Sequence, residues 1–214
     1  MITVLLSLFL IFIVLVLSEI LWNAKILRGE LGRKFVHITV GSFVAFWPFF
    51  MSFHYIELIS IAFLIVVLAV RRLKIFQAIH TVNRESWGDI LFAIGIGLTA
   101  LATSSNWIFT IAILHLSLAD GLAAVVGSHF GKNSEYKILG HKKSIVGTLT
   151  FCLVSLIILL IALNQGSTQA LSLPLLIWLP VAAAALENVA VLGFDNIFVP
   201  LLLVVALSPL KFVS

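Results

Sequence analysis

The sequence predicts an all-α, polytopic integral membrane protein with about eight transmembrane helices, seven being the alternative count, and no soluble domain. Of the 214 residues, 62% are hydrophobic and only 10% are charged. Mean hydropathy is +1.21, and a water-soluble fold cannot hide that much apolar surface. Crossing about 30 Å of hydrocarbon takes roughly 20 helical residues, and stretches of about that length follow one another with short connections between them. We therefore expect residues 1–214 to form a single transmembrane domain.

The apolar runs define the predicted helices in order. They fall near residues 2–22, 35–53, 55–70, 88–103, 107–126, 145–163, 173–192 and 196–210. The first run has no basic residue before it and lacks a small-x-small cleavage site. We therefore interpret it as a transmembrane helix rather than a signal peptide.

The charges of the connections predict the orientation. The connections near 23–34, 71–87 and 127–144 contain every lysine and arginine except Lys211, and those near 51–55, 103–107 and 164–172 contain none. Because short cytoplasmic loops of membrane proteins are enriched in these residues, we place the basic connections in the cytoplasm and both termini on the other side. This placement accounts for the net charge of +4, so we expect no nucleic acid partner.

Arg33, Lys34 and His37 lie at the start of the second predicted helix. With a helical period of 3.6 residues, the two cations share a face with the imidazole. Such a group could hold phosphates or help to deprotonate a hydroxyl. The alternative is a pair of membrane anchors beside an interfacial histidine.

A short polar segment, Arg84-Glu85-Ser86-Trp87-Gly88-Asp89, precedes the fourth run. Arg84 could clamp a phosphate, with Glu85 or Asp89 ordering its side chain. The same segment also fits a plain helix start with Ser86 as the N-cap.

Asp120 lies near the end of the fifth run. A carboxylate is costly in hydrocarbon and usually marks a pathway or a site. It could hold Mg²⁺, which prefers one or two carboxylates together with phosphate oxygens. The alternative is an interfacial aspartate without a ligand.

A loop rich in glycine and lysine follows Asp120. Gly127 and Gly131 would let backbone N–H groups approach phosphates, and Ser144 is placed to cap the next helix, whose N-terminus favours anions. The cations that would neutralise a phosphate are Lys132, Lys142 and Lys143. A P-loop is excluded because the spacing is one residue short and no strand precedes it. An ordinary cytoplasmic loop remains the alternative.

Glu187 and Asp195 flank the connection between the last two runs. They could complete a metal site or supply a base. Gly193 is expected to break the helix between them, so the sequence does not place them on one face. A turn capped by Asp195 and Asn196 is the competing interpretation.

These four segments resemble the motifs of the polyprenol kinase family, which groups dolichol, phytol and farnesol kinases with CTP-dependent diacylglycerol kinases and is related to phosphatidate cytidylyltransferases. The resemblance extends from about Arg33 to Pro200 and is most specific over 118–148. The matching motifs are Arg33-Lys34-x-x-His37, Arg84-x-Ser86-x-Gly88, Asp120-Gly121-x-Ala123-x-x-x-Gly127-x-x-x-Gly131-Lys132, Lys143-Ser144-x-x-Gly147-Thr148, and Glu187 followed by Asp195-Asn196-x-x-x-Pro200.

The resemblance implies a transmembrane catalytic domain that transfers a phosphoryl group from CTP, or another nucleoside triphosphate, to an isoprenoid alcohol such as phytol, farnesol or dolichol. Its active face would be cytoplasmic, its cofactor Mg²⁺, and its partners the nucleotide, the lipid alcohol and the bilayer. The expected catalytic residues are Asp120, His37, Asp195 and Glu187, with Asp120 and Asp195 as metal ligands. The expected nucleotide-binding residues are Arg33, Lys34, Arg84, Gly121, Gly127, Gly131, Lys132, Lys142, Lys143, Ser144 and Gly147.

Three other functions remain open at this point. A lipid-phosphate cytidylyltransferase would use the same nucleotide and metal but make a CDP-lipid. A small transporter should show repeated halves and broken helices at mid-membrane, whereas the polar residues here cluster toward one interface. A passive assembly subunit would not need Asp120 or Asp195.

Overall fold

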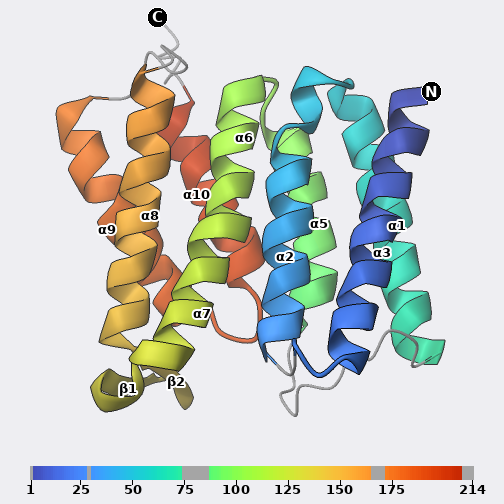
Figure 1. Cartoon of the computed structure of the whole chain (residues 1–214). Helices are drawn as coiled ribbons and strands as arrows, with labels where there is room; N and C mark the ends of the chain where they lie inside the picture. Colours follow the sequence, from blue (N-terminus) through green and yellow to red (C-terminus); the bar gives the residue numbers. More distant parts are fainter. Residues whose placement is uncertain (1, 28–29, 74–86, 165–171, 209–214) are drawn as a thin grey trace, which may run out of the picture.

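The computed structural model describes residues 2–27, 30–73, 87–164 and 172–208. Within these ranges, each predicted apolar run corresponds to one helical rod (Figure 1). The rods are α1 (Ile2–Asn23), α2 (Glu30–Ala45), α3 (Phe53–Leu73), α5 (Gly88–Ala102), α6 (Asn106–Leu114) continued by α7 (Asp120–Phe130), α8 (Ile145–Asn164), α9 (Leu173–Val189) and α10 (Asp195–Leu207). The all-α prediction is therefore confirmed.

Among the described residues, four helices are long and apolar enough to cross a membrane: Ile2–Asn23, Phe53–Leu73, Asn106–Phe130 and Ile145–Leu163. Three further apolar helices, Gly88–Ala102, Leu173–Val189 and Asp195–Leu207, are shorter. The chain is thus an integral membrane protein. The predicted count of about eight spans stays a prediction, because only some of the helices have the full length.

A β-hairpin interrupts the helices within the predicted 127–144 connection. After a 3₁₀ turn at Lys132–Ser134, strand β1 (Glu135–Ile138) pairs antiparallel with β2 (His141–Ser144). The strands are joined by Leu139 and Gly140, both with positive φ (48° and 82°), as a tight two-residue hairpin turn requires. The sequence analysis treated this segment only as a loop, because its strands are short and have no apolar alternation.

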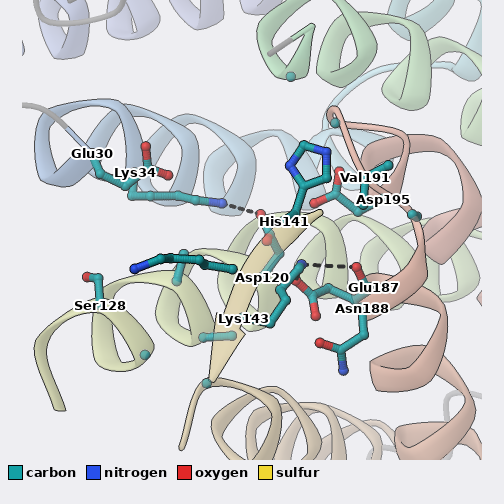
Figure 2. A pocket seen from close by; sticks show the side chains of 18 of the residues that line it. Glu30, Lys34, Asp120, Ser128, His141, Lys143, Glu187, Asn188, Val191 and Asp195 are labelled. Atoms are coloured by element: carbon teal, nitrogen blue, oxygen red, sulfur yellow. Dashed lines mark hydrogen bonds and ion pairs between the residues drawn. The ribbon is translucent and has the colours of Figure 1, made fainter. Parts of the chain in front are cut away.

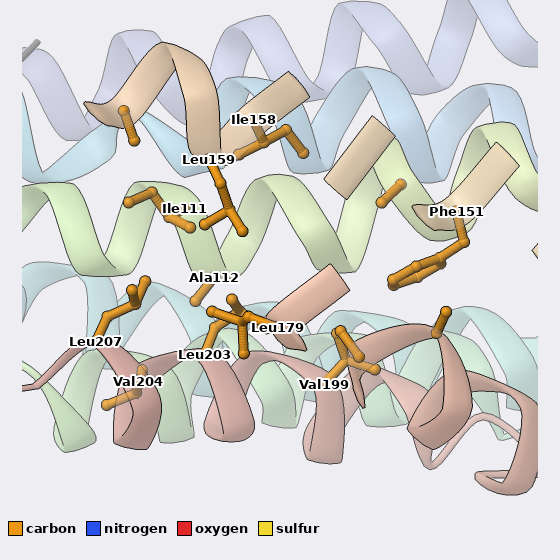
Figure 3. Close-up of a cluster of buried hydrophobic side chains, with 14 of the residues drawn as sticks. Ile111, Ala112, Phe151, Ile158, Leu159, Leu179, Val199, Leu203, Val204 and Leu207 are labelled. Atoms are coloured by element: carbon orange, nitrogen blue, oxygen red, sulfur yellow. The ribbon is translucent and has the colours of Figure 1, made fainter. Parts of the chain in front are cut away.

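The hydrophobic core has two parts. One lies among α6, α7, α8, α9 and α10 and includes Phe151, Leu159 and Leu203 (Figure 3). The other lies among α1, α2, α3, α5 and α6 and includes Val44, Ile56 and Phe109. Since α6 contributes to both, it joins the two halves.

Glycines bring α2 against the α6–α7 rod. A Cβ at Gly41 would overlap the Ser117 side chain, and a Cβ at Gly121 would overlap that of Ile38. Lipid provides no hydrophobic force between helices, so close packing of this kind is what associates them. The polar residues near the start of α2 are consequently held against α7.

The β-hairpin lies at one end of the bundle, and the start of α1 and the end of α10 lie at the other (Figure 1). This arrangement agrees with the alternation predicted from the basic connections. Which end faces the cytoplasm stays a prediction from the charge bias.

Candidate active site

A pocket of about 480 Å³ opens at the hairpin end of the bundle (Figure 2). This volume lies within the roughly 300–1,000 Å³ of small-molecule sites. Its charged or titratable lining comes from several helices and both strands: Glu30, Arg33, Lys34, Arg71, Asp89, Asp120, Glu135, His141, Lys142, Lys143, Glu187 and Asp195. Residues distant in sequence therefore share one cavity.

Three carboxylates form the centre of this pocket. One oxygen each from Asp120, Glu187 and Asp195 lies within 4.8 Å of the other two. Asp120 and Glu187 are buried, and the Oδ1 atom of Asp195 is buried without a hydrogen-bond partner among the described residues. Like charges at this separation repel one another, and an all-oxygen donor set suits a hard cation such as Mg²⁺. The residues present therefore fit the expected metal, with Glu187 beside the two ligands anticipated from sequence.

Two lysines accompany these carboxylates. Lys34 Nζ lies 2.5 Å from Asp120 Oδ2, and Lys143 forms an ion pair with the Glu187 side chain and donates to the Glu187 carbonyl at 3.1 Å. Burial alone would lower the pKa of Lys143, but the Glu187 carboxylate outweighs that effect, and the pKa is raised. Lys143 is therefore a permanent cation beside the carboxylates.

His37 fixes the position of Asp120. Its Nε2 lies 2.8 Å from the Leu116 carbonyl oxygen and 3.1 Å from Asp120 Oδ2. A carbonyl can only accept, so Nε2 carries the proton. His37 is thus positioned to orient Asp120, and the catalytic role expected from its motif stays a prediction.

A π-helical segment, His115–Ala119, makes the Leu116 carbonyl available to His37. The Asp120 N–H donates to the His115 carbonyl, five residues back, instead of to that of Leu116. Such π-bulges occur often at functional sites. The irregularity directly precedes Asp120, so it links the local backbone geometry to the site.

The turn between α9 and α10 positions Asp195. Gly193 has a φ of +99°, and a Cβ there would meet the Gly88 backbone. The Trp87 N–H donates to the Leu192 carbonyl at 3.1 Å, and Asn196 Nδ2 donates to the Gly88 carbonyl at 3.3 Å. The expected helix break at Gly193 is present, and the reversal turns Asp195 back toward Glu187.

Ser144 caps α8, as predicted from the sequence. Its Oγ accepts a hydrogen bond from the Gly147 N–H at 3.1 Å, which satisfies one free donor of the first helical turn. Gly127 and Gly131 pack against the Ser144 side chain, and Gly147 approaches Gly127. These glycines therefore bring the end of α7 onto the start of α8 at the pocket wall.

The hairpin is fastened to α8 and α9 near the pocket. The Tyr136 hydroxyl lies 2.5 Å from Thr148 Oγ1 and donates to Asn188 Oδ1 at 2.7 Å, and Asn188 Nδ2 donates to the Ala184 carbonyl at 2.9 Å. Sequence analysis assigned no role to Tyr136 or Asn188. The position of Asn188 directly after Glu187 was the available signal.

Not every predicted nucleotide-binding residue lines the pocket. Gly121 faces Ile38 on α2, Gly131 is packed behind Ser144, and the Lys132 side chain is exposed outside the cavity. Lys142 lines the pocket with an exposed side chain that pairs with Glu135 at 3.0 Å. Arg84 lies outside the described residues.

Two cations have partners that the sequence did not indicate. Arg71 Nε donates to Asp89 Oδ2 at 2.8 Å, and its guanidinium lies 5.6 Å from the centre of the Trp87 ring. Arg33 pairs with Glu30 one helical turn earlier. The sequence analysis counted Arg71 only among the basic residues of a connection, so its place in the pocket was missed.

Comparison with known proteins places the chain in a family. No family model matches the sequence, and no solved structure matches it. A phytol kinase of Synechocystis sp. is 32% identical over 198 residues, an alignment that covers 88% of this chain and 82% of that protein. Since the alignment covers 88% of this chain, it includes most of the segments that build the pocket. The chain belongs to the polyprenol kinase family.

Proposed function

We propose that the protein is a membrane lipid-alcohol kinase that transfers a phosphoryl group from CTP, or another nucleoside triphosphate, to an isoprenoid alcohol such as phytol, farnesol or dolichol. The relative from Synechocystis sp. carries the name phytol kinase. The observation that supports the proposal most strongly is the meeting of three carboxylates and two lysines in one pocket at the end of a membrane bundle. A metal-bound triphosphate and the hydroxyl of a membrane-dissolved alcohol can react only where a charged pocket lies at the end of the membrane bundle.

The charges of the pocket suit a magnesium triphosphate. Asp120 and Glu187 would hold Mg²⁺, which when bound neutralises charge on the phosphate oxygens. Lys34 and Lys143 are buried or half-buried beside these carboxylates. On nucleotide binding the two lysines would exchange a carboxylate for a phosphate, and they would neutralise the remaining anionic charge.

Arg33 and the start of α8 would contact the part of the nucleotide that lies farther from the carboxylates. Arg33 lines the same pocket as Lys34, and a guanidinium suits bidentate contact with phosphate. The capped first turn of α8 presents Gly147 and Thr148 to the pocket. A helix N-terminus favours anions there.

Asp195 is the proposed base. Its buried Oδ1 has no hydrogen-bond partner among the described residues, so it is free to accept a proton from the lipid hydroxyl. The hydroxyl oxygen bonds to the γ-phosphorus while its proton moves to Asp195. The bond from the γ-phosphorus to the bridging oxygen breaks, and the nucleoside diphosphate leaves. Positioning and charge neutralisation are what the protein contributes to such a transfer.

Product analysis with position-specific labels tests this proposal. Purified protein in detergent with Mg²⁺ is incubated with CTP or ATP labelled at either the α- or the γ-phosphate. The acceptors are phytol, farnesol, dolichol, diacylglycerol and phosphatidate. We expect the γ-label in an isoprenoid alcohol, none after chelation of the metal, and none with Asp120→Asn.

Two results would contradict the proposal. Transfer of the α-label to phosphatidate would identify the cytidylyltransferase reaction instead. Absence of either label from every lipid, with the protein folded and Mg²⁺ present, would favour the transporter alternative.

A further inference from the structure

A second cavity of about 250 Å³ lies in the membrane part of the bundle, among α1, α2, α3 and α5. Its walls are aliphatic and aromatic side chains, among them Ile11, Val40, Phe63 and Ile96. The Ser60 hydroxyl, also at its wall, donates to the Glu57 carbonyl of its own helix at 2.7 Å. Trp47 Nε1, at the same wall, has no hydrogen-bond partner among the described residues. An apolar ligand therefore takes no hydrogen bond away from either group.

The cavity lies beyond the polar pocket along α2. Lys34, His37, Val40 and Val44 recur on one helical face; Lys34 lines the polar pocket, and the two valines line the apolar cavity. At 1.5 Å per residue, positions 34 and 44 are about 15 Å apart along the helix.

A thin aromatic layer separates the two cavities. The rings of His37 and Phe92 lie with centres 4.6 Å apart, and Phe92 lies 6.5 Å from Phe63, which lines the apolar cavity. Helix α3 also runs along both cavities, because its Phe63 lines the apolar cavity and its Arg71 lines the polar pocket. The active-site end and the apolar cavity therefore share two walls.

The cavity also lies at the lipid-facing edge of the protein. The outer faces of α1 and α3 expose large apolar side chains, including Phe9, Ile61 and Ile65. Ala62 and Val66, which line the cavity, are themselves exposed. A membrane-dissolved molecule can enter between α1 and α3 without passing through water.

We infer that this cavity binds part of the isoprenoid chain of the alcohol and selects its length and branching, an inference that rests on the proposed kinase function. The chain is the part of such a substrate that needs an apolar space, and this cavity shares walls on α2 and α3 with the phosphate site. The cavity is smaller than the roughly 300 Å³ of sites that enclose a whole ligand, so the remainder of the chain stays in the bilayer. Because the chain is already in hydrocarbon, packing and not water exclusion supplies the discrimination.

A pair of matched substitutions tests the inference. Ala62→Phe fills the mouth of the cavity, and Ala182→Phe makes the same change at an exposed position of α9 outside both cavities. We expect Ala62→Phe to raise the KM for phytol about tenfold, the usual scale of a pocket altered by a small group. The KM for the nucleotide should be unchanged, the short alcohol geraniol should be affected less, and Ala182→Phe should behave as wild type.

Photolabelling provides a readout that does not need catalysis. A diazirine analogue of phytol is irradiated with the protein in nanodiscs without nucleotide or Mg²⁺, and the adducts are mapped by mass spectrometry. We expect adducts on the α1 and α3 residues of the cavity in wild type and Ala182→Phe, and their loss in Ala62→Phe. Nucleotide binding is the control for folding. An Ala62→Phe protein that is folded but impaired still binds nucleotide, whereas a misfolded one does not.

The outcomes separate this inference from the proposed function. If the kinase is active but adducts spread over all lipid-facing helices, or phospholipid acyl chains label the cavity equally well, the inference is overturned. It is overturned as well if Ala62→Phe leaves the KM for phytol unchanged. If the cavity is labelled specifically but no alcohol is phosphorylated, the proposed function fails while the binding site stands.

Discussion

Buried polar side chains in the middle of the bundle differ from those at the hairpin end. His115, within the π-helical segment, has Nδ1 2.8 Å from the Ile111 carbonyl and Nε2 2.7 Å from Ser155 Oγ. Its two nitrogens are therefore both satisfied by groups of the bundle. His37 instead shares Asp120 with Lys34, and the nearby Asp195 Oδ1 has no hydrogen-bond partner among the described residues.

The contrast distinguishes buried polar side chains that stabilise the bundle from those that could bind a ligand. A closed pair such as His115 and Ser155 joins two helices and offers nothing to a ligand. A cluster with adjacent like charges and an unsatisfied oxygen keeps electrostatic energy that a cation can relieve. The following substitutions should lose activity at the hairpin end and only stability in the middle.

Asp120→Asn should have the largest effect. It removes a proposed metal ligand and the partner of Lys34, and we expect kcat/KM to fall by about 1,000-fold, which corresponds to about 4 kcal/mol of transition-state stabilisation. The rate of γ-label transfer to phytol measures this loss. Thermal unfolding in detergent provides the control for folding. Activity within tenfold of wild type would show that Asp120 is no more functional than His115.

Asp195→Asn should lower kcat by about 100-fold, because the substitution removes the proposed base while keeping the shape of the side chain. Titration with Mg²⁺ sharpens the assignment. A kcat that remains low at saturating Mg²⁺ supports a base, whereas recovery at high Mg²⁺ supports a metal ligand. Unchanged kinetics at every Mg²⁺ concentration would remove Asp195 from the site.

Lys143→Gln and Lys142→Gln form a matched pair on one strand. Lys143 contacts the buried Glu187, and Lys142 makes an exposed pair with Glu135. We expect Lys143→Gln to raise the KM for the nucleotide about tenfold, since charge-assisted contacts contribute roughly 1.5–3 kcal/mol. Lys142→Gln should change it by less than about threefold, because exposed ion pairs contribute little. An equal rise in the KM for the nucleotide in both variants would indicate that the overall positive charge of this surface, and not a specific contact of Lys143, attracts the nucleotide.

Ser155→Ala should have the smallest effect. It removes one interhelical hydrogen bond in the middle of the bundle, and such bonds average about 0.6 kcal/mol. We expect a small loss of stability in detergent unfolding and a kcat/KM within about twofold of wild type. A loss of activity comparable to that of Asp195→Asn would contradict the division between the two regions.

The helical rods and the local features of the site were predictable from sequence, because they depend on neighbouring residues. The hydropathy of the apolar runs located the rods, and the serine before α8 was identified as its cap. The hairpin was missed, since its stability comes from Tyr136 contacting Thr148 and Asn188 rather than from an alternating pattern. The partnership of Arg71 with Asp89 was missed because it joins two helices.

Some motif residues make contacts in the structure that were not predicted from the sequence. Gly121 and Gly131 were expected to bind nucleotide, yet they lie at close contacts with Ile38 and Ser144. His37 contacts Asp120, and its expected catalytic role stays a prediction. In each case the packing partner determines what the residue contacts.

The pattern of residues along the chain is enough to identify a helical membrane protein whose basic residues gather in alternate connections. It also marks Asp120, Glu187 and Asp195 as unusual in such surroundings. Hydropathy, charge bias and helical period are properties of contiguous residues, so they need no knowledge of the fold. That the three carboxylates face one another is evident only in the folded protein. Their meeting depends on the packing of α7, α9 and α10 around one core and on the turn at Gly193. Those contacts join residues far apart in the chain, and the sequence pattern contains no measure of distance between them.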